Sequence, residues 1–257
     1  MSGIQSLRRG LDPVAFAESA GFDVTLPWQE AVLRSHAPSL LINAARQSGK
    51  SSMAAVLAVH TALYTPGSLV LMVSRTLDHS GELFRRALAV YRHAGRPVPP
   101  DSETRLSLTL ANGSRIVSRP GRDEASVRGY SSDLLILDEA SRVPDELFKS
   151  SLPVVARTGG RILAMSTPYG KRGWWYEEWA NGAEWERHLL PASALPEDWY
   201  KPSTAVFLER ERRRMSEREL LQEYHCAFQE LDGQAVFRHD LIADAFGDES
   251  IEALWPD

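Results

Sequence analysis

Four short apolar runs, separated by stretches with helical periodicity, constrain the fold of this chain more than any other feature. The runs are residues 39–45, 68–74, 133–140 and 160–168. Each is short and nearly continuous in apolar side chains, which is typical of strands covered on both faces. Helical spacing between them, as in residues 50–64 and 77–93, predicts an α/β fold with a mostly parallel sheet and helices on both faces. Residues 105–118 alternate around Asn112-Gly113 and predict a β-hairpin.

The sequence AARQSGKSS, residues 44–52, joins the first apolar run to a helix and ends like a phosphate-binding loop. In such loops backbone N–H groups converge on the phosphates, the lysine contacts the outer phosphates and the next hydroxyl ligates Mg²⁺. The alternative is a Gly-Lys-Ser turn that only closes into a helix, but the strand before it and the acidic strand farther along the chain favour a nucleotide. We therefore predict that ATP and Mg²⁺ bind here. The predicted contacts are Ala45, Arg46, Gln47, Ser48, Gly49, Lys50, Ser51 and Ser52, with Ser51 on the metal.

Two acids follow the apolar run LLIL at residues 134–137. Ligands of open α/β sheets gather at the carboxyl ends of the strands, so Asp138 is predicted to hold Mg²⁺ and Glu139 to activate a water. Their alternative role is to cap the next helix. Together with the loop, the acids indicate a P-loop NTPase of the ASCE/RecA-like class.

Further polar residues fit the same site. Ser166 and Thr167, before Pro168, end the next strand, where hydroxyls can sense the γ-phosphate. Gln29 precedes the first strand, and its amide is suited to the adenine edge, although a glutamine there is often a surface residue.

Composition limits the classes of partner and cofactor. The chain is 43% hydrophobic and 25% charged, as in ordinary globular proteins, and its net charge of −5 restricts any contact with DNA to a local patch. The single cysteine, Cys226, excludes an internal disulfide and a cysteine-based zinc cluster. It indicates a reducing, intracellular environment and a packing role. No run approaches the roughly 18 apolar residues of a membrane span, so we expect no membrane partner.

Four segments, LPWQ, AARQSGKSS, SVRGYSSDLLILDEAS and LAMSTPYGKRGWWYEEW, occur in this order. Over roughly residues 25–237 the chain resembles the ATPase domain of the large terminase subunit, the DNA-packaging motor of tailed bacteriophages. The resemblance implies an ATP-driven motor that moves double-stranded DNA into procapsids. It also implies a ring of five subunits, docking on the portal protein, a small terminase subunit as partner, and action in the host cytoplasm with at most a transient place on the virion.

By position, the resemblance assigns roles to individual residues. Lys50, Ser51, Asp138 and Glu139 match the phosphate, magnesium and catalytic contacts, Ser166 to Pro168 match the coupling motif, and Gln29 matches the adenine motif. Arg46 matches the loop arginine, expected to act in its own subunit or to switch by pairing with an acid. Arg128 matches an arginine presented to the neighbouring subunit. Such an arginine raises turnover by about 10³–10⁵; the alternative for both is an ordinary surface arginine.

The pattern changes after about residue 195. We expect a P-loop core with a helical lead-in over residues 1–195, and a helical lid or linker with a tail over 196–257. Large terminases usually continue into a nuclease domain, whose metal site is a cluster of acids. Asp240, Asp244 and Asp248 lie in a tail with no predicted sheet that could hold them together as such a site. We therefore expect no DNA cleavage, with the nuclease in another domain or chain.

Two conspicuous groups of side chains favour structural roles. The arginines of RERRR, residues 210–214, offer a face for phosphates, but nearby glutamates favour a balanced, solvated surface. The aromatic residues Trp174, Trp175, Tyr176 and Trp179 are expected to pack a helix against the sheet rather than stack on bases.

Two other functions stay open. A helicase-like or remodelling ATPase shares these motifs, although no second RecA-like domain is evident. A nucleotide-gated assembly protein with little turnover is the other, and Glu139 argues against it because such proteins usually lack the catalytic acid.

Overall fold

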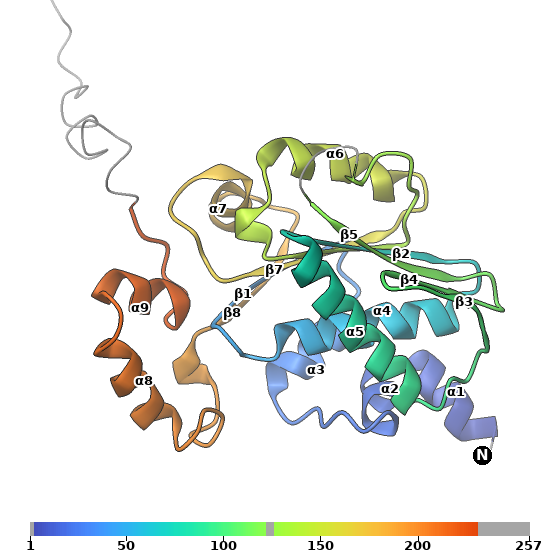
Figure 1. The fold of residues 1–257 in the computed structure, drawn as a ribbon, viewed down its shortest axis with the longest axis horizontal. Helices are drawn as coiled ribbons and strands as arrows, with labels where there is room; N and C mark the ends of the chain where they lie inside the picture. The colour runs from blue at the N-terminus through green and yellow to red at the C-terminus, as the bar shows by residue number, and fades with distance from the viewer. Residues whose placement is uncertain (1–2, 122–125, 231–257) are drawn as a thin grey trace, which may run out of the picture.

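The computed structural model describes residues 3–121 and 126–230. Its centre is one sheet of eight strands in the order β3-β4-β5-β2-β6-β7-β1-β8 (Figure 1). The strands are β1 (Ser39–Ala44), β2 (Leu69–Ser74), β3 (Pro100–Glu103), β4 (Ser107–Leu110), β5 (Arg115–Pro120), β6 (Leu134–Asp138), β7 (Arg161–Ser166) and β8 (Glu186–Leu190). The β3–β4 and β4–β5 pairs are antiparallel and the other pairs are parallel. The predicted mostly parallel sheet is confirmed.

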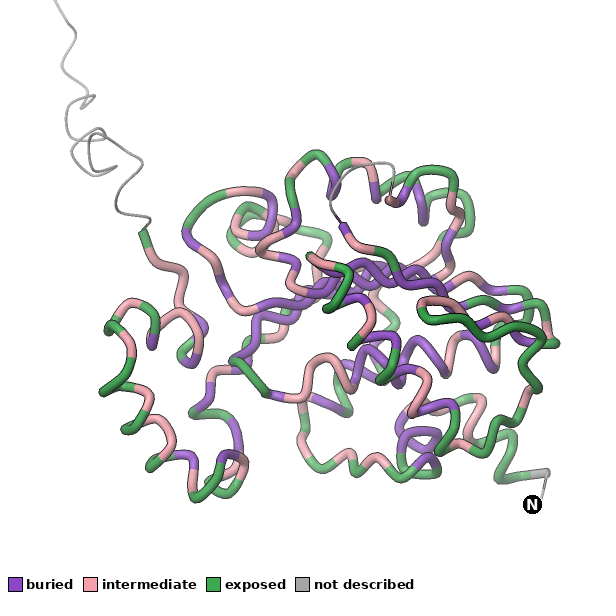
Figure 2. The backbone as a smooth tube through the Cα atoms, in the orientation of Figure 1, coloured by how far each residue is buried: buried purple, intermediate pink, exposed green. Residues whose placement is uncertain are grey.

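Helices cover both faces of the sheet (Figure 1). One face carries α2 (Pro13–Ser19), α3 (Pro27–Arg34), α4 (Lys50–Tyr64) and α5 (Leu77–His93), with α1 (Gly3–Leu11) at their edge. The other face carries α6 (Asp145–Ala156) and α7 (Gly173–Ala180). Because β1, β2, β6 and β7 lie between these layers, almost all of their residues are buried (Figure 2). This explains their uninterrupted apolar sequences.

The hairpin predicted around Asn112-Gly113 is formed by β4 and β5, with Gly113 at a φ of 82°. Two edge strands were not predicted. β3 is exposed along its length, and β8 alternates between exposed and more buried positions. Their polar sequences, PDSE and ERHLL, lack the apolar runs of the central strands because an edge strand is not covered on both sides.

The predicted helical segment after residue 195 contains α8 (Thr204–Arg212) and α9 (Glu217–Glu223). A small cluster of buried side chains joins this segment to the start of the phosphate loop; its members are Ala45, Ala192, Leu195, Tyr200, Leu220, Tyr224 and Cys226. Cys226 is buried, as the packing role requires, and burial raises the pKa of its thiol to about 12.

The arginines of RERRR do not form one continuous helical face, because α8 ends at Arg212. Arg213 pairs with Glu209 at 3.2 Å and Arg214 with Glu211 at 3.4 Å. These exposed ion pairs support the balanced, solvated surface.

The aromatic residues of α7 serve mainly in packing. Trp174 and Trp175 are buried, and Trp174 stacks on Phe148 of α6 at 3.8 Å between ring centroids. Tyr176 differs from the expectation, because its ring packs on Phe228, at 5.1 Å. Phe228 belongs to the segment that follows α9 and not to the sheet.

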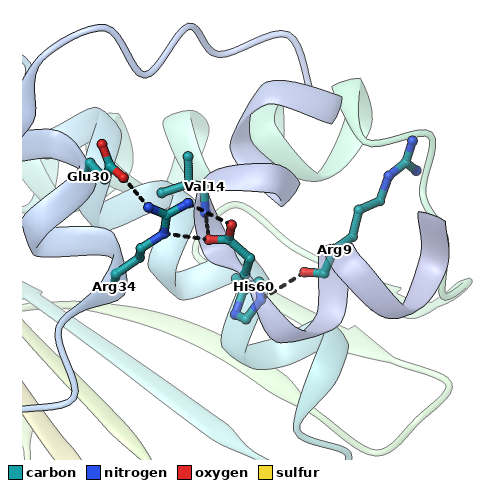
Figure 3. Close-up of polar contacts among 6 residues, drawn as sticks. Arg9, Val14, Glu30, Arg34 and His60 are labelled. Carbon is teal, nitrogen blue, oxygen red and sulfur yellow. Dashed lines mark hydrogen bonds and ion pairs between the residues drawn. The ribbon is translucent and has the colours of Figure 1, made fainter. Parts of the chain in front are cut away.

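The N-terminal helices are fastened to the core by polar contacts (Figure 3). Asp12 accepts hydrogen bonds from Val14 N at 3.0 Å and from Arg34 Nη2 at 2.9 Å, and Arg34 also pairs with Glu30. His60 of α4 lies 3.1 Å from the Arg9 carbonyl oxygen. The hydrogen bond from Arg34 holds the pKa of Asp12 below its ordinary value of 3.8.

Replacing Asp12 with alanine is expected to lower the free energy of unfolding by about 1–2 kcal/mol, because a helix cap and an exposed ion pair are lost together. Since the folded-state pKa of Asp12 is depressed, its contribution is complete above pH 3.8 and is lost as the pH falls through the folded-state value. Urea unfolding at pH 7 and at pH 3 measures both effects. The exposed Asp23 provides the control, and Asp23→Ala should change the free energy by less than about 0.5 kcal/mol. An equal loss in both variants would contradict the role of Asp12.

Candidate nucleotide and catalytic site

The loop between β1 and α4 turns sharply into the start of the helix. Gln47 and Gly49 have positive φ angles of 56° and 91°, and Gly49 is the N-cap of α4. Helix α4 therefore starts at Lys50, with the positive end of its dipole at the loop. This geometry is that of an anion-binding loop.

The phosphate loop is also tied to the segment after residue 190. Trp199 Nε1 donates to the Gln47 carbonyl at 3.0 Å, and Tyr200 Oη donates to the Arg46 carbonyl at 2.5 Å. Arg46 N donates to the Glu223 carbonyl at 3.0 Å. Three hydrogen bonds thus join the backbone of the loop to this later segment.

One pocket of about 360 Å³ brings the loop together with the ends of β6 and β7. Eight of the predicted site residues line it: Arg46, Gln47, Lys50, Ser51, Asp138, Glu139, Ser166 and Thr167. The lysine, the two acids and the coupling hydroxyls, far apart in the sequence, thus face one space.

The electrostatics of the pocket fit a nucleotide with its metal ion. Burial lowers the pKa of Lys50, despite the attraction of Asp138, and no carboxylate of the described residues forms an ion pair with its ammonium group. Burial raises the pKa of Asp138 to about 6, despite the opposite effect of Lys50. A phosphate beside Lys50 and a cation beside Asp138 would offset both desolvation costs. Within the described ranges, no three His, Cys, Asp or Glu side chains are grouped to hold a further metal ion.

Glu139 lines the pocket and has a left-handed conformation, with a φ of 53°. Its Oε2 lies 3.0 Å from His79 Nδ1 on α5, and Asp138 Oδ1 accepts a hydrogen bond from its backbone N–H at 3.0 Å. Ser166 Oγ donates to Ser141 Oγ at 2.7 Å, which links the end of β7 to the turn after Glu139.

Other predicted residues lie outside the pocket lining. Ala45 and Ser48 are buried within the loop, and Ser52 and Pro168 follow residues that line the pocket. Gln29 is buried, and its Oε1 accepts hydrogen bonds from Thr25 N and Leu26 N, both at 3.0 Å. Its oxygen is therefore used to hold the start of α3, and only its NH₂ group remains for an adenine ring.

The two predicted arginines lie in different places. Arg46 lines the nucleotide pocket, and its Nε is 3.9 Å from Glu223 Oε2, so it is paired with an acid of α9. Arg128 lines a separate pocket with Tyr130, Glu146 and Lys149.

Sequence reasoning missed several residues of the nucleotide pocket, namely Arg75, His79, Glu82, Leu83, Arg86, Ser141, Arg142 and Glu223. Arg75 directly follows the buried strand β2, so the rule that placed the acids after β6 would also have found it. His79, Glu82 and Arg86 share one face of α5, which the sequence does not orient toward the pocket.

Comparison with known proteins identifies the family. The profile described as "Terminase large subunit, T4likevirus-type, N-terminal" matches residues 41–244. The chain belongs to the terminase large subunit family. The large terminase subunit of Thermus phage G20c is 28% identical over 234 residues, which cover 78% of this chain and 48% of that protein. The chain therefore spans about half the length of this relative.

Solved terminase structures have the same fold. The large terminase ATPase domain of Thermus phage P74-26 superposes with a TM-score of 0.74 and 26% identity, covering 85% of this chain and all of that one. A large terminase from a thermophilic bacteriophage, solved in complex with ADP, has a TM-score of 0.60 at 13% identity, covering 79% of this chain and 53% of that one. The predicted α/β fold and the family resemblance are both confirmed for this terminase chain. None of its described helices is both long enough and apolar enough to cross a membrane.

Replacing Lys50 with alanine is expected to weaken ATP binding by about 10- to 100-fold, since one charge-assisted contact to the phosphates is lost. The ligand-free variant should unfold at the same or a higher urea concentration, because a half-buried cation without an ion-pair partner among the described residues is removed. Calorimetric titration with a non-hydrolysable ATP analogue measures the affinity. Lys171→Ala, which removes an exposed lysine paired with Glu230 at 2.9 Å, should leave the affinity unchanged. Retained affinity in Lys50→Ala would contradict the site.

Proposed function

We propose that this chain is the ATP-hydrolysing motor domain of a phage large terminase and drives double-stranded DNA into procapsids. The observation that carries the proposal is the convergence of Lys50, Asp138 and Glu139 on one pocket at the carboxyl edge of the sheet. Membership of the terminase family and the likeness to a terminase ATPase domain support the same activity.

In this proposal the N–H groups of the loop and Lys50 hold the phosphates, and Ser51 and Asp138 hold Mg²⁺. When bound, the metal ion neutralises charge on the β- and γ-phosphates. Glu139 accepts a proton from the attacking water. Ser166 and Thr167 sense the γ-phosphate at the end of β7. Gln29 contributes its NH₂ group to the adenine.

The two arginines, Arg46 and Arg128, are proposed to act on the nucleotides of different subunits. Arg46 acts on the nucleotide of its own chain, and its ion pair with Glu223 supports a switch between a resting and an engaged position. Arg128 lies in a pocket apart from the nucleotide pocket of its own chain, which supports action on the nucleotide of a neighbour in a ring.

The partners follow from the same proposal: the portal protein of the procapsid, the small terminase subunit, four further copies in a five-membered ring and, in the host cytoplasm, double-stranded DNA. We also propose the division into a core over 1–195 and a lid with a tail over 196–257, supported by α8 and α9, which follow the last strand of the sheet. Nuclease activity is assigned to another domain or chain; Asp240, Asp244 and Asp248 lie outside the described residues.

The test is ATP hydrolysis as a function of protein concentration, with and without purified procapsids that carry a portal. The motor predicts that activity per chain rises with concentration and rises again with procapsids. Duplex unwinding without procapsids would favour the helicase. Binding of ATP without turnover under every condition would favour the nucleotide-gated assembly protein.

A further inference from the structure

A second pocket, of about 470 Å³, lies beside the nucleotide pocket and contains three arginines. They come from three different places in the fold. Arg75 follows β2, Arg142 ends the 3-10 helix η2 (Ala140–Arg142), and Arg172 is the N-cap of α7. This pocket is therefore assembled from the carboxyl edge of the sheet and the start of α7.

The charge of this second pocket is strongly positive. Asp145 is its only carboxylate among the described lining residues, against three arginines. One oxygen of Asp145 already accepts a hydrogen bond from Trp174 N at 2.9 Å. Among the described residues, the guanidinium groups of Arg75 and Arg142 have no ion-pair partner. The lining thus offers more positive charge than it neutralises.

One aromatic ring holds two of the cations near each other. The guanidinium carbon of Arg142 lies 3.4 Å from the centroid of the Tyr169 ring, and that of Arg172 lies 5.8 Å from the same centroid. The ring offsets part of the repulsion between the cations through its π face. Two planar guanidinium groups so arranged can each donate paired hydrogen bonds to a tetrahedral oxyanion.

The two pockets adjoin each other. Arg75, Ser141 and Arg142 line both of them. Ser141 accepts the hydrogen bond from Ser166 at the end of β7, where the γ-phosphate is proposed to be sensed. Arg75 and Arg142 can therefore contact an anion in either pocket.

We infer that the second pocket is a product site for the orthophosphate that ATP hydrolysis releases. The inference rests on the proposed function, because only a hydrolase produces this ion in the adjoining pocket. The ion is a mixture of the monoanion and the dianion near neutral pH, so its negative charge matches the excess of positive charge, and its oxygens suit guanidinium donors. Occupation of the pocket would hold phosphate near the coupling motif after the bond to ADP is broken.

Substitution of Arg172 tests the second pocket without altering the lining of the nucleotide pocket, because Arg172 lines only the second pocket. Calorimetric titration of the ADP-loaded chain with inorganic phosphate measures the product site without any turnover. Arg172→Ala is expected to weaken phosphate binding about tenfold, the factor for one lost charge-assisted hydrogen bond, with ADP affinity unchanged. Arg172→Glu should weaken it further, and Arg172→Lys should retain most of it.

Arg157→Ala is the matched control, since Arg157 is an exposed arginine at the end of α6 and lines neither pocket. It should change neither affinity. Unchanged phosphate affinity in Arg172→Ala, or no phosphate binding by the wild-type chain at millimolar concentration, would overturn the product site while leaving the ATPase untouched. A loss confined to binding of a DNA duplex would instead assign the arginines to the DNA backbone and also overturn it. If the wild-type chain binds phosphate but hydrolyses no ATP, the result contradicts the proposed ATPase function, and the pocket is then a phosphate site but not a product site.

Discussion

Replacing Glu139 with glutamine is expected to lower the rate of ATP hydrolysis by about 10²–10⁴-fold, the usual contribution of a general base. Glutamine keeps the size of the side chain and its hydrogen-bonding reach, but its amide does not accept the proton of the attacking water. Binding of ATP should change little, because Lys50 and the loop remain. The rate is measured as phosphate release with portal-bearing procapsids present, and the affinity by calorimetry with a non-hydrolysable analogue.

Glu82 gives a demanding control for this prediction. It lines the same pocket as Glu139, but it pairs with Arg85 at 2.6 Å and with Arg86 at 3.3 Å. Glu82→Gln should therefore keep a rate within a few-fold of the wild type. If Glu139→Gln retained most of its turnover, or if both variants lost it equally, the assignment of the base would be wrong.

The central part of the fold could be predicted from the sequence because burial on both faces forces a recognisable composition. Strands β1, β2, β6 and β7 are covered on both faces, so nearly all of their side chains must be apolar. The candidate site residues lie at the ends of these strands and in the turns that follow them. The loop before Lys50 and the acids at 138 and 139 could therefore be identified from their residue types together with their position after these strands. Their convergence on one pocket is a consequence of parallel strands ending at one edge.

The edges of the sheet and the second layer of the site could not be predicted in this way. β8 is partly exposed, so its sequence ERHLL carries no apolar run, and its place beside β1 depends on tertiary contacts. His79 reaches Glu139 only because one face of α5 is turned toward the pocket. Likewise, Tyr176 packs on Phe228, a partner more than fifty residues away whose proximity no local pattern encodes.

The same limit applies to residues that act across an interface, since a single chain contains only half of such a site. Arg128 was singled out by resemblance, and the structure places it with Glu146 and Lys149 in a pocket apart from Lys50. In a ring, each interface is heterologous, so a residue on one side of a subunit can complete the nucleotide site of the next subunit.

Arg128→Ala is accordingly expected to reduce stimulated ATP hydrolysis by about 10³-fold or more while leaving ATP binding nearly intact. The loss arises because the charge that develops on the transferred phosphoryl group is no longer offset by the neighbour. Lys149→Ala removes another cation from the same pocket and should retain most of the activity. Equal losses in the two variants would indicate a general effect of charge on the surface, not an arginine in the reaction.

Mixing two inactive chains distinguishes action across the interface from action within one chain. In an equal mixture of Arg128→Ala and Glu139→Ala, about a quarter of the ring interfaces pair an intact Arg128 with an intact Glu139. Activity should therefore reappear in the mixture, at up to about that fraction of the wild-type rate if the sites work independently. A mixture that stays inactive, although each chain binds ATP and assembles on procapsids, would exclude action across the interface. Activity that neither variant has alone requires one chain to supply the arginine and the other to supply the base.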